Sequence, residues 1–214
     1  MPGTPAVLHR RLSTERLAPY RAACGGDLGR AIALYGWNTD IAAAFWATLG
    51  YFEILMRNAM HEQLTRWSQR QYDEPRWYTD PGQVFSMPTL EAIQEAWEHA
   101  TRNGRRESPG RVVTELSFGF WRFLLTSYYE RTLWRPCLRH AFQYGPGLRR
   151  VVHDKLFVIH NLRNRLAHHE PIHNRPLAVL RAEVIEVAGW ISPQTQAWID
   201  SRCTVSSILA RRPS

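Results

Sequence analysis

The chain has 214 residues and a formal net charge of +8 at pH 7, with 44% hydrophobic and 21% charged residues. These fractions exclude an intrinsically disordered chain, and the length is sufficient to bury a full core. The positive charge comes almost entirely from Arg, whose planar guanidinium binds phosphate through two hydrogen bonds. The charge therefore favours an anionic partner, nucleic acid ahead of an acidic membrane surface, and a merely basic surface is the plainer alternative.

The cysteines and the N-terminal segment indicate the cellular compartment. Cys24, Cys137 and Cys203 are far apart and match neither a zinc-binding spacing nor a disulfide framework, so we expect reduced thiols. The first residues lack the apolar core of a signal peptide, and no segment approaches the roughly 18 apolar residues that span a bilayer. The sequence therefore predicts a cytoplasmic protein without a membrane partner, and no pattern calls for a cofactor or a metal.

Hydrophobic periodicity predicts an all-α protein with a single helical domain. We expect a flexible N-terminus over residues 1–12, the helical domain over residues 13–210 and a short tail over residues 211–214. Helices are predicted over residues 13–24, 28–35, 40–69, 89–102, 111–116, 118–131, 148–168, 176–191 and 193–209. No segment sustains a strict alternation of apolar and polar residues, so no sheet is expected.

The longest predicted helix, residues 40–69, carries its apolar residues at steps of three and four positions, which is typical of one buried face. Asn38 or Thr39 is expected to begin this helix and to separate it from the shorter helix over residues 28–35. Asp27 is expected to cap the shorter helix at its N-terminus.

Two aromatic segments need an interpretation. Residues 73–87 contain several turn-forming residues and are predicted to be a loop that Trp77 and Tyr78 anchor in the core. Residues 114–122 mix small polar and aromatic side chains, which favours core packing over a surface that stacks nucleic-acid bases. The Arg-rich linker over residues 105–110 is either a track for RNA phosphates or a solvated loop.

The segment from Arg163 to His169 is the most informative part of the chain. It combines a fixed cation, an amide and two imidazoles just before Pro171 ends a predicted helix. Asn164 and His168 are one helical turn apart on the same face, and the long side chain of Arg163 reaches the same opening. His168 lies in the last turn, where the helix C-terminus favours the imidazolium.

This combination of side chains suits cleavage of RNA without a metal. Such cleavage needs a base for the ribose 2′-OH proton, an acid for the leaving 5′-oxygen and a cation for the charge on the phosphorane. Arg163 fits the role of the cation, and His168 fits a proton-transfer role. One imidazole cannot be acid and base at once, so the chemistry predicts a homodimer in which a twofold partner supplies the second group.

Plainer explanations of the motif remain open. In the first, Arg163 and Arg165 are solvated and the two adjacent histidines only end a helix. In the second, His168, His169 and His173 bind a metal, although their spacing does not place three imidazoles on one helical face and no Cys lies nearby.

A second polar cluster lies within the longest predicted helix. Glu53 and Arg57 are one turn apart and are expected to pair, with Asn58 beside them. The cluster either contacts the Arg163 motif and orients it, or forms only an intrahelical salt bridge. Arg57 and His61 also fit a loose Arg–His pattern, which is a less favoured candidate for a second catalytic site.

Residues 163–172 resemble the signature of the Abi-like (AbiD/AbiF-type) abortive-infection proteins, which belong to the HEPN superfamily. Further stretches that are similar to this family lie at residues 34–38, 52–59, 113–121 and 133–136. The resemblance therefore extends over most of the chain, and the combination of stretches is more specific than the short Arg–His pattern alone.

The resemblance implies an all-helical, HEPN-like bundle with extra helices that forms a homodimer. It also implies a metal-independent endoribonuclease that acts in phage defence or as the toxin of a toxin–antitoxin pair, with an RNA or protein antitoxin as a partner. By the family motif, Arg163, Asn164 and His168 would be catalytic, and His169 is the alternative histidine because the spacer varies. Some members of the superfamily bind RNA or a protein without cutting, so a non-catalytic binding module is the alternative function.

Overall fold

The protein is all-α, as the periodicity predicts. A computed structural model describes residues 4–213, and every regular element within this range is a helix. The α-helices are α1 (Thr4–Leu12), α2 (Thr14–Ala23), α3 (Leu28–Tyr72), α4 (Met87–Thr101), α5 (Pro109–Glu115), α6 (Phe118–Phe123), α7 (Arg149–Ala167), α8 (Leu177–Ile191), α9 (Pro193–Arg202) and α10 (Val205–Leu209). Short connections form the 3₁₀ helices η1 (Trp77–Thr79), η2 (Arg102–Gly104), η3 (Ser127–Tyr129) and η5 (Leu138–Phe142), and the π-helical turn η4 (Glu130–Trp134).

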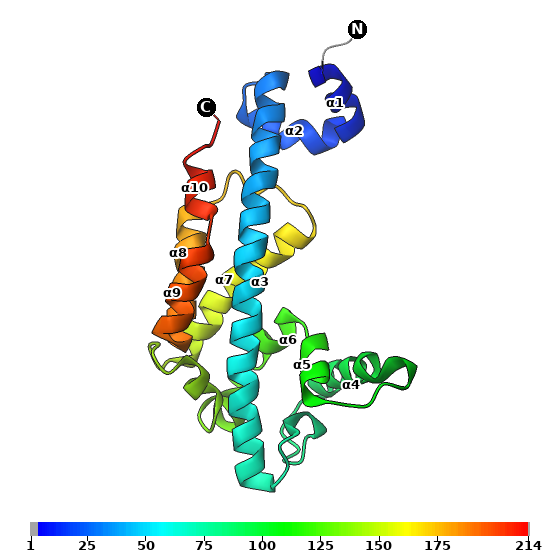
Figure 1. The fold of residues 1–214 in the computed structure, drawn as a ribbon, viewed down its shortest axis with the longest axis vertical. Helices are drawn as coiled ribbons and strands as arrows, with labels where there is room; N and C mark the ends of the chain where they lie inside the picture. Colours follow the sequence, from blue (N-terminus) through cyan, green and yellow to red (C-terminus); the bar gives the residue numbers. More distant parts are fainter. Residues whose placement is uncertain (1–3, 214) are drawn as a thin grey trace.

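Helix α3 is the axis of the fold and runs along its whole length (Figure 1). Its 45 residues correspond to about 68 Å at the α-helical rise per residue. Asp27 caps it as predicted, because the carboxylate accepts a hydrogen bond from the backbone N–H of Arg30 at 2.9 Å. Buried residues recur along α3 at three- and four-residue steps from Ala31 to Leu64, so one continuous stripe of this helix faces the core.

The predicted break of this helix at Asn38 and Thr39 is wrong. Asn38 is buried, and its Oδ1 accepts hydrogen bonds from the backbone N–H groups of Ile172 at 2.9 Å and His173 at 3.0 Å. The hydroxyl of Thr39 donates to the carbonyl of Tyr35 one turn earlier, at 3.1 Å. The side chains of Asn38 and Thr39 therefore have hydrogen-bond partners while α3 continues through both residues, and neither residue caps a new helix.

The remaining helices form groups around α3 (Figure 1). Helices α1 and α2 pack at its N-terminal end, and α8, α9 and α10 lie along one side. Helices α4 and α5 pack against each other beside its C-terminal half. Helix α7 crosses α3 obliquely and also contacts α6 and α8. The helix that carries the Arg163 motif is therefore held from several sides.

Buried hydrophobic residues form one continuous cluster. The ring of Trp77 lies between 5.8 and 6.2 Å, centroid to centroid, from the rings of Phe85, Trp121 and Phe120. Trp77 therefore anchors the loop in the core, as predicted. The segment over residues 114–122 also supplies buried aromatic side chains, which confirms core packing over a base-stacking surface.

The helix predicted over residues 118–131 ends early. Helix α6 stops at Phe123, whose carbonyl accepts a hydrogen bond from the hydroxyl of Thr126 at 2.8 Å. The guanidinium of Arg149 donates to the carbonyl of Leu125 at 2.6 Å. These side chains occupy the carbonyls that a continuing α-helix would pair with its own amides, so the backbone turns into η3 and η4.

The two ends of the chain also differ from the prediction. Residues Thr4–Leu12, expected within a flexible N-terminus, form α1, and the side chain of Leu12 packs against the core; residues 1–3 lie outside the described residues. The helix predicted over residues 193–209 is divided into α9 and α10 at Cys203, where the backbone is extended. No helix within residues 4–213 has the length and apolarity needed to cross a bilayer.

Candidate functional site

Helix α7 presents the Arg163 motif at its C-terminal end. Its buried residues share one face and are Val152, Leu156, Ile159, Leu162 and Leu166. Arg163 lies at the edge of this face and is half-buried, whereas Asn164 is rotated about 100° further around the helix. His168 ends the helix and is exposed. The apolar pattern of α7 therefore holds Arg163 beside α3 and leaves His168 open to solvent.

Two residues of α3 fix the position of the Arg163 side chain. Nε of Arg163 lies 3.8 Å from Oε2 of Glu53, and Cζ of Arg163 lies 5.6 Å from the centroid of the Trp46 ring. Nε is buried and makes no hydrogen bond among the described residues. The ion pair is partly exposed, so it contributes little to stability and acts mainly to position the guanidinium.

Arg163 lines a groove between α3 and the end of α7, with a volume of about 670 Å³. We call it the α3–α7 groove, and its lining residues are Thr39, Ala42, Ala43, Trp46, Ala47, Arg163, Leu166, Ala167 and His169. None of these lining residues is acidic. The groove therefore joins an apolar wall to a fixed cation.

Of the two exposed histidines of the motif, only His169 lines the groove. The backbone N–H of His168 donates to the carbonyl of Asn164 at 3.0 Å, which closes the last turn of α7. His169 follows with a φ of 52°, a left-handed conformation that is uncommon outside Gly and that turns the chain sharply. As a result His169 lines the α3–α7 groove beside Arg163, whereas His168 is exposed and does not line it.

The side chain of Asn164 contacts His160, one turn earlier on α7, and does not line the α3–α7 groove. Its Nδ2 lies 3.3 Å from Nε2 of His160, whose ring stacks on Phe118 at 5.4 Å between centroids. Burial, together with the cations of Arg122 and Arg163, lowers the pKa of His160 below its usual value. This favours the neutral imidazole, whose Nε2 accepts a hydrogen bond from the amide of Asn164. Sequence reasoning did not identify this role of His160.

The second polar cluster is only partly assembled. Of the two alternatives for Glu53, the contact with Arg163 is the one that forms, and the intrahelical pair with Arg57 is not formed among the described residues. Nε of Arg57 is buried and has no hydrogen-bond partner among residues 4–213, and Asn58 is exposed. Nδ1 of His61 accepts a hydrogen bond from Nε1 of Trp77 at 2.9 Å, so this histidine is engaged in packing.

His173, the third histidine of the metal hypothesis, has a structural environment. It is buried, and its ring centroid lies 4.7 Å from that of Tyr20. In the part of the chain that the structure describes, no three His, Cys, Asp or Glu side chains are grouped so that they could hold a metal. Cys24, Cys137 and Cys203 are free thiols, and burial raises the pKa of Cys137 to about 12.

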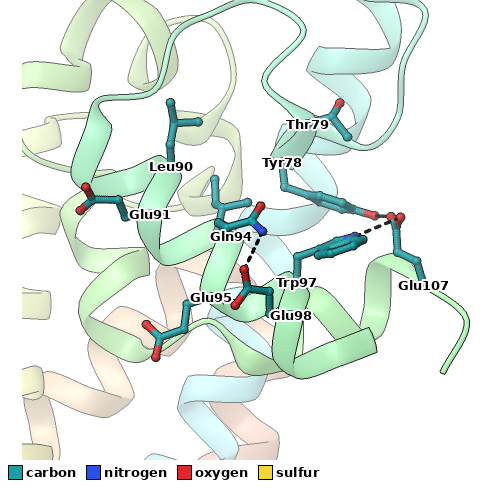
Figure 2. Close-up of a pocket in the computed structure, with 10 residues that line it drawn as sticks. Tyr78, Thr79, Leu90, Glu91, Gln94, Glu95, Trp97, Glu98 and Glu107 are labelled. Atoms are coloured by element: carbon teal, nitrogen blue, oxygen red, sulfur yellow. Dashed lines mark hydrogen bonds between the residues drawn. The ribbon is translucent and has the colours of Figure 1, made fainter. Parts of the chain in front are cut away.

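A second cavity, of about 700 Å³, lies over α4, and sequence reasoning did not predict it. We call it the α4 cavity; its lining residues include Tyr78, Glu91, Glu95, Trp97, Glu98 and Glu107. Figure 2 shows the rings of Tyr78 and Trp97 pointing toward Glu107, with Glu91 and Glu95 at the other end of the cavity. A signal existed in the sequence, because Glu91, Glu95 and Glu98 recur at helical spacing on one face.

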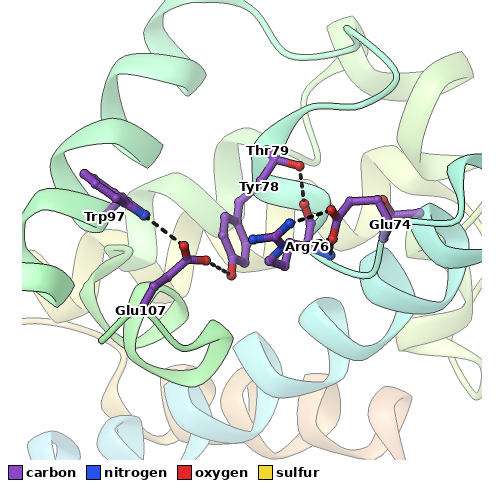
Figure 3. A network of polar contacts seen from close by, with 7 residues as sticks. Glu74, Arg76, Tyr78, Thr79, Trp97 and Glu107 are labelled. Carbon is purple, nitrogen blue, oxygen red and sulfur yellow. Dashed lines mark hydrogen bonds and ion pairs between the residues drawn. The ribbon is translucent and has the colours of Figure 1, made fainter. Parts of the chain in front are cut away.

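The carboxylate of Glu107 is occupied by two aromatic donors (Figure 3). The hydroxyl of Tyr78 donates to Oε1 at 2.8 Å, and Nε1 of Trp97 donates to Oε2 at 3.3 Å. Burial and the hydrogen bond to this carboxylate raise the pKa of Tyr78. Nearby, Arg76 binds Glu74 through two guanidinium nitrogens at 2.9 and 2.7 Å, which lowers the pKa of Glu74 to about 2. This network ties the linker after α4 to η1.

The electrostatics of the two cavities are opposite. Four carboxylates line the α4 cavity, and they repel a polyanion. The α3–α7 groove instead contains Arg163 and His169. Of these two cavities, the groove is the one that suits phosphate. No protein-family model, no curated protein and no solved structure matches this chain, so the functional argument rests on these residues.

Proposed function

We propose that the protein is a metal-independent endoribonuclease of the HEPN type, with Arg163, Asn164 and His168 as its catalytic residues. The observation that carries the proposal is the placement of Arg163, which Glu53 and Trp46 hold at the wall of an open groove without acidic lining. The motif, its resemblance to Abi-like proteins and the net charge support the same function.

The residues have distinct chemical roles in this proposal. A neutral imidazole takes the proton of the ribose 2′-OH, the 2′-oxygen forms a bond to phosphorus, and the bond from phosphorus to the 5′-oxygen breaks. An imidazolium gives its proton to the 5′-oxygen, which leaves a 2′,3′-cyclic phosphate and a free 5′-OH. The guanidinium of Arg163 stabilises the charge on the phosphorane. Asn164, held by His160, fixes the edge of the site near His168.

The mechanism needs two proton-transfer groups, and we propose that a twofold homodimer brings two copies of His168 together. Phe157 and Val158 support this arrangement, because their side chains are 46% and 39% exposed on α7, near Asn164. Exposed apolar side chains beside a polar motif are typical of an interface. A contact across this face of α7 would leave the α3–α7 groove of each protomer accessible to RNA.

The resemblance also suggests the biological setting. We propose that the enzyme acts in the cytoplasm, in phage defence by abortive infection or as the toxin of a toxin–antitoxin pair. An RNA or protein antitoxin would then restrain it. Co-expression with the genes that flank its own tests this part, because a gene that relieves growth inhibition encodes an antitoxin.

Incubation of purified protein with mixed single-stranded RNA in the presence of a chelator tests the nuclease activity. We expect cleavage that leaves 2′,3′-cyclic phosphate ends, no cleavage of DNA, and a His168→Ala variant that binds RNA but does not cut it. Arg163→Lys should restore activity only in part, since the ammonium lacks the planar fork. A requirement for a divalent metal or equal cleavage of DNA would refute the mechanism. Binding without cleavage by the wild type would favour a non-catalytic module.

A further inference from the structure

We infer that the α3–α7 groove is a subsite for one unpaired nucleobase of the RNA, with the ring of Trp46 as its stacking surface. The inference rests on the proposed function, because it takes RNA as the ligand. It adds a residue outside the Arg163 motif that determines how the substrate is held.

The exposure of Trp46 is the first observation. Its side chain is 48% exposed, although it lies in the middle of a helix whose other large apolar residues are mostly buried. It follows Phe45 directly, so it lies about 100° around the helix from that buried residue and outside the buried stripe of α3. Burial in the core therefore does not explain this indole, and its exposed surface is left for a ligand.

Small neighbours keep the ring accessible. The residues one turn before Trp46 are Ala42 and Ala43, and Gly50 lies one turn after it. An added Cβ at Gly50 would meet no atom within 4 Å, so this part of the surface is open. Side chains of ordinary size at these positions would cover the indole. The alanines instead form a low apolar floor beside it, and together they line the groove.

Arg163 supplies the second half of a nucleotide site. Its guanidinium carbon lies 5.6 Å from the centroid of the Trp46 ring, so a base on the free part of this surface has its own phosphate within reach of Arg163. His169 lines the same groove, and its imidazole adds a second group that can form a hydrogen bond to the phosphate or to the base. The apolar surface and the cation thus match the two parts of a nucleotide.

The size and charge of the groove fit this occupant. Its volume of about 670 Å³ falls within the roughly 300–1,000 Å³ of small-molecule sites. The stacked bases of a duplex do not present their faces, whereas unpaired bases stack readily on aromatic side chains. A second copy of this chain is a poorer occupant of the groove, because it would bring a net charge of +8 to a surface that already holds Arg163.

Steady-state cleavage of a single-stranded RNA by Trp46→Ala and Trp46→Phe variants tests the subsite. We expect Trp46→Ala to raise KM by about 5- to 150-fold, the range that corresponds to loss of one stacked base, and to lower kcat as well, because the indole also positions the guanidinium of Arg163. Trp46→Phe should retain part of the affinity. Trp97→Ala is the matched control, since Trp97 is also exposed (39%) but lines the acidic α4 cavity, and its KM should equal that of the wild type.

An RNA with one abasic nucleotide beside the cleavage site completes the test. The wild type should lose about as much affinity for the abasic RNA as Trp46→Ala loses for the intact RNA. The Trp46→Ala variant should lose little more, because the two changes remove the same contact. Equal KM values for wild type and Trp46→Ala, or an equal abasic penalty in both, would overturn the subsite.

Binding measurements separate this inference from the proposed function. The affinity of His168→Ala and of His168→Ala/Trp46→Ala for the same RNA is measured by fluorescence anisotropy. If RNA binding depends on Trp46 but the wild type does not cut the RNA, the subsite is supported and the nuclease activity is refuted. If the wild type and Trp46→Ala cut and bind the RNA equally well, the nuclease activity is supported and the subsite is refuted. If the RNA is neither bound nor cut by the wild type, the nuclease activity and the subsite are both refuted. A Trp46→Ala variant that changes only self-association, with RNA affinity intact, would assign the groove to a second copy and overturn the subsite.

Discussion

The α3–α7 groove and the α4 cavity are similar in volume, at about 670 and 700 Å³, but opposite in chemistry. The groove has one strong cation and no acidic lining residue, whereas the cavity is lined by Glu91, Glu95, Glu98 and Glu107. The comparison teaches that size alone does not identify the site of a polyanion. In this chain the sign of the lining charge separates the two.

Glu107 of the α4 cavity and Arg163 of the groove also differ in how far their polar atoms are satisfied. In the α4 cavity, Glu107 accepts hydrogen bonds from Tyr78 and Trp97. In the groove, the guanidinium of Arg163 makes no hydrogen bond within the described chain; its contacts are the 3.8 Å ion pair with Glu53 and the ring of Trp46. A charged group whose hydrogen bonds are already made holds the fold together, while one with free donors remains available to a ligand.

Arg163→Ala should have the largest effect. Removing the cation should lower kcat/KM for RNA by about 10²- to 10³-fold, the usual loss for one group that stabilises transition-state charge, and should weaken RNA binding as well. Glu107→Gln in the α4 cavity is the control and should leave both quantities unchanged. Cleavage assays and filter binding at two salt concentrations measure these effects. Equal losses in the two variants would show that the cavities are not functionally distinct.

Glu53→Gln should have a smaller effect, on the order of 10-fold in kcat, because the uncharged amide no longer fixes the guanidinium of Arg163. RNA affinity should stay level or rise, since a negative charge beside the groove is removed. This split between kcat and affinity distinguishes a positioning role from a general loss of structure. If kcat and affinity fall together along with thermal stability, Glu53 has only a structural role.

Stability should depend on pH through three histidines, of which His173 is buried and His61 and His160 are half-buried. Burial lowers the pKa values of His61, His160 and His173 below the ordinary 6.5; the cations of Arg122 and Arg163 add to this at His160, the cation of Arg212 adds to it at His173, and Glu62 opposes it at His61. The three imidazoles therefore bind protons more readily in the unfolded chain than in the folded one. The free energy of unfolding should be level above about pH 7.5 and should fall as the pH drops through 6.5 toward the lower folded values.

Urea denaturation at several pH values between about pH 8 and about pH 5 measures this dependence. His61→Gln should reduce the slope, because that titration is removed while an acceptor for Nε1 of Trp77 is retained. The lowered pKa of Glu74 acts at lower pH, since its ordinary value is 4.5. A free energy of unfolding that rises on acidification through pH 6.5 would contradict the burial of these imidazoles.

Tyr78→Phe should give the smallest effect. Loss of the hydrogen bond to Glu107 should lower the free energy of unfolding by about 1–2 kcal/mol, with RNA cleavage unchanged. Trp97 still donates to the same carboxylate, so the linker after α4 should stay in place. Chemical denaturation and the cleavage assay measure the two outcomes. A large loss of cleavage would give the α4 cavity a part in catalysis.

Local sequence signals predicted much of the fold. The buried stripe of α3, the cap at Asp27 and the end of α7 before Pro171 all follow from spacing and from residue type. The predicted helix break at Asn38 is wrong because the hydrogen-bond partners of Asn38, the backbone N–H groups that follow α7, are distant in the sequence. Propensity cannot report a hydrogen bond of that kind.

The site was only partly predictable for the same reason. The motif itself was visible in the sequence, and Trp46 could have been found, since it lies off the apolar stripe among small residues. The sequence left the partner of Glu53 open between two alternatives, because Arg57 at one turn and Arg163 across the helix contact compete for one carboxylate. The packing of α7 against α3 decides this competition in favour of Arg163.

Photo-crosslinking tests the central claim most directly, because it reports where RNA lies. A single-stranded RNA that carries 4-thiouridine is crosslinked to the His168→Ala variant, and the modified peptides are identified by mass spectrometry. We predict crosslinks on α3 around Trp46 and at the C-terminal end of α7, with few on α4. Crosslinks concentrated on α4 and η1, or spread evenly over the basic surface, would contradict the assignment of the α3–α7 groove as the RNA site.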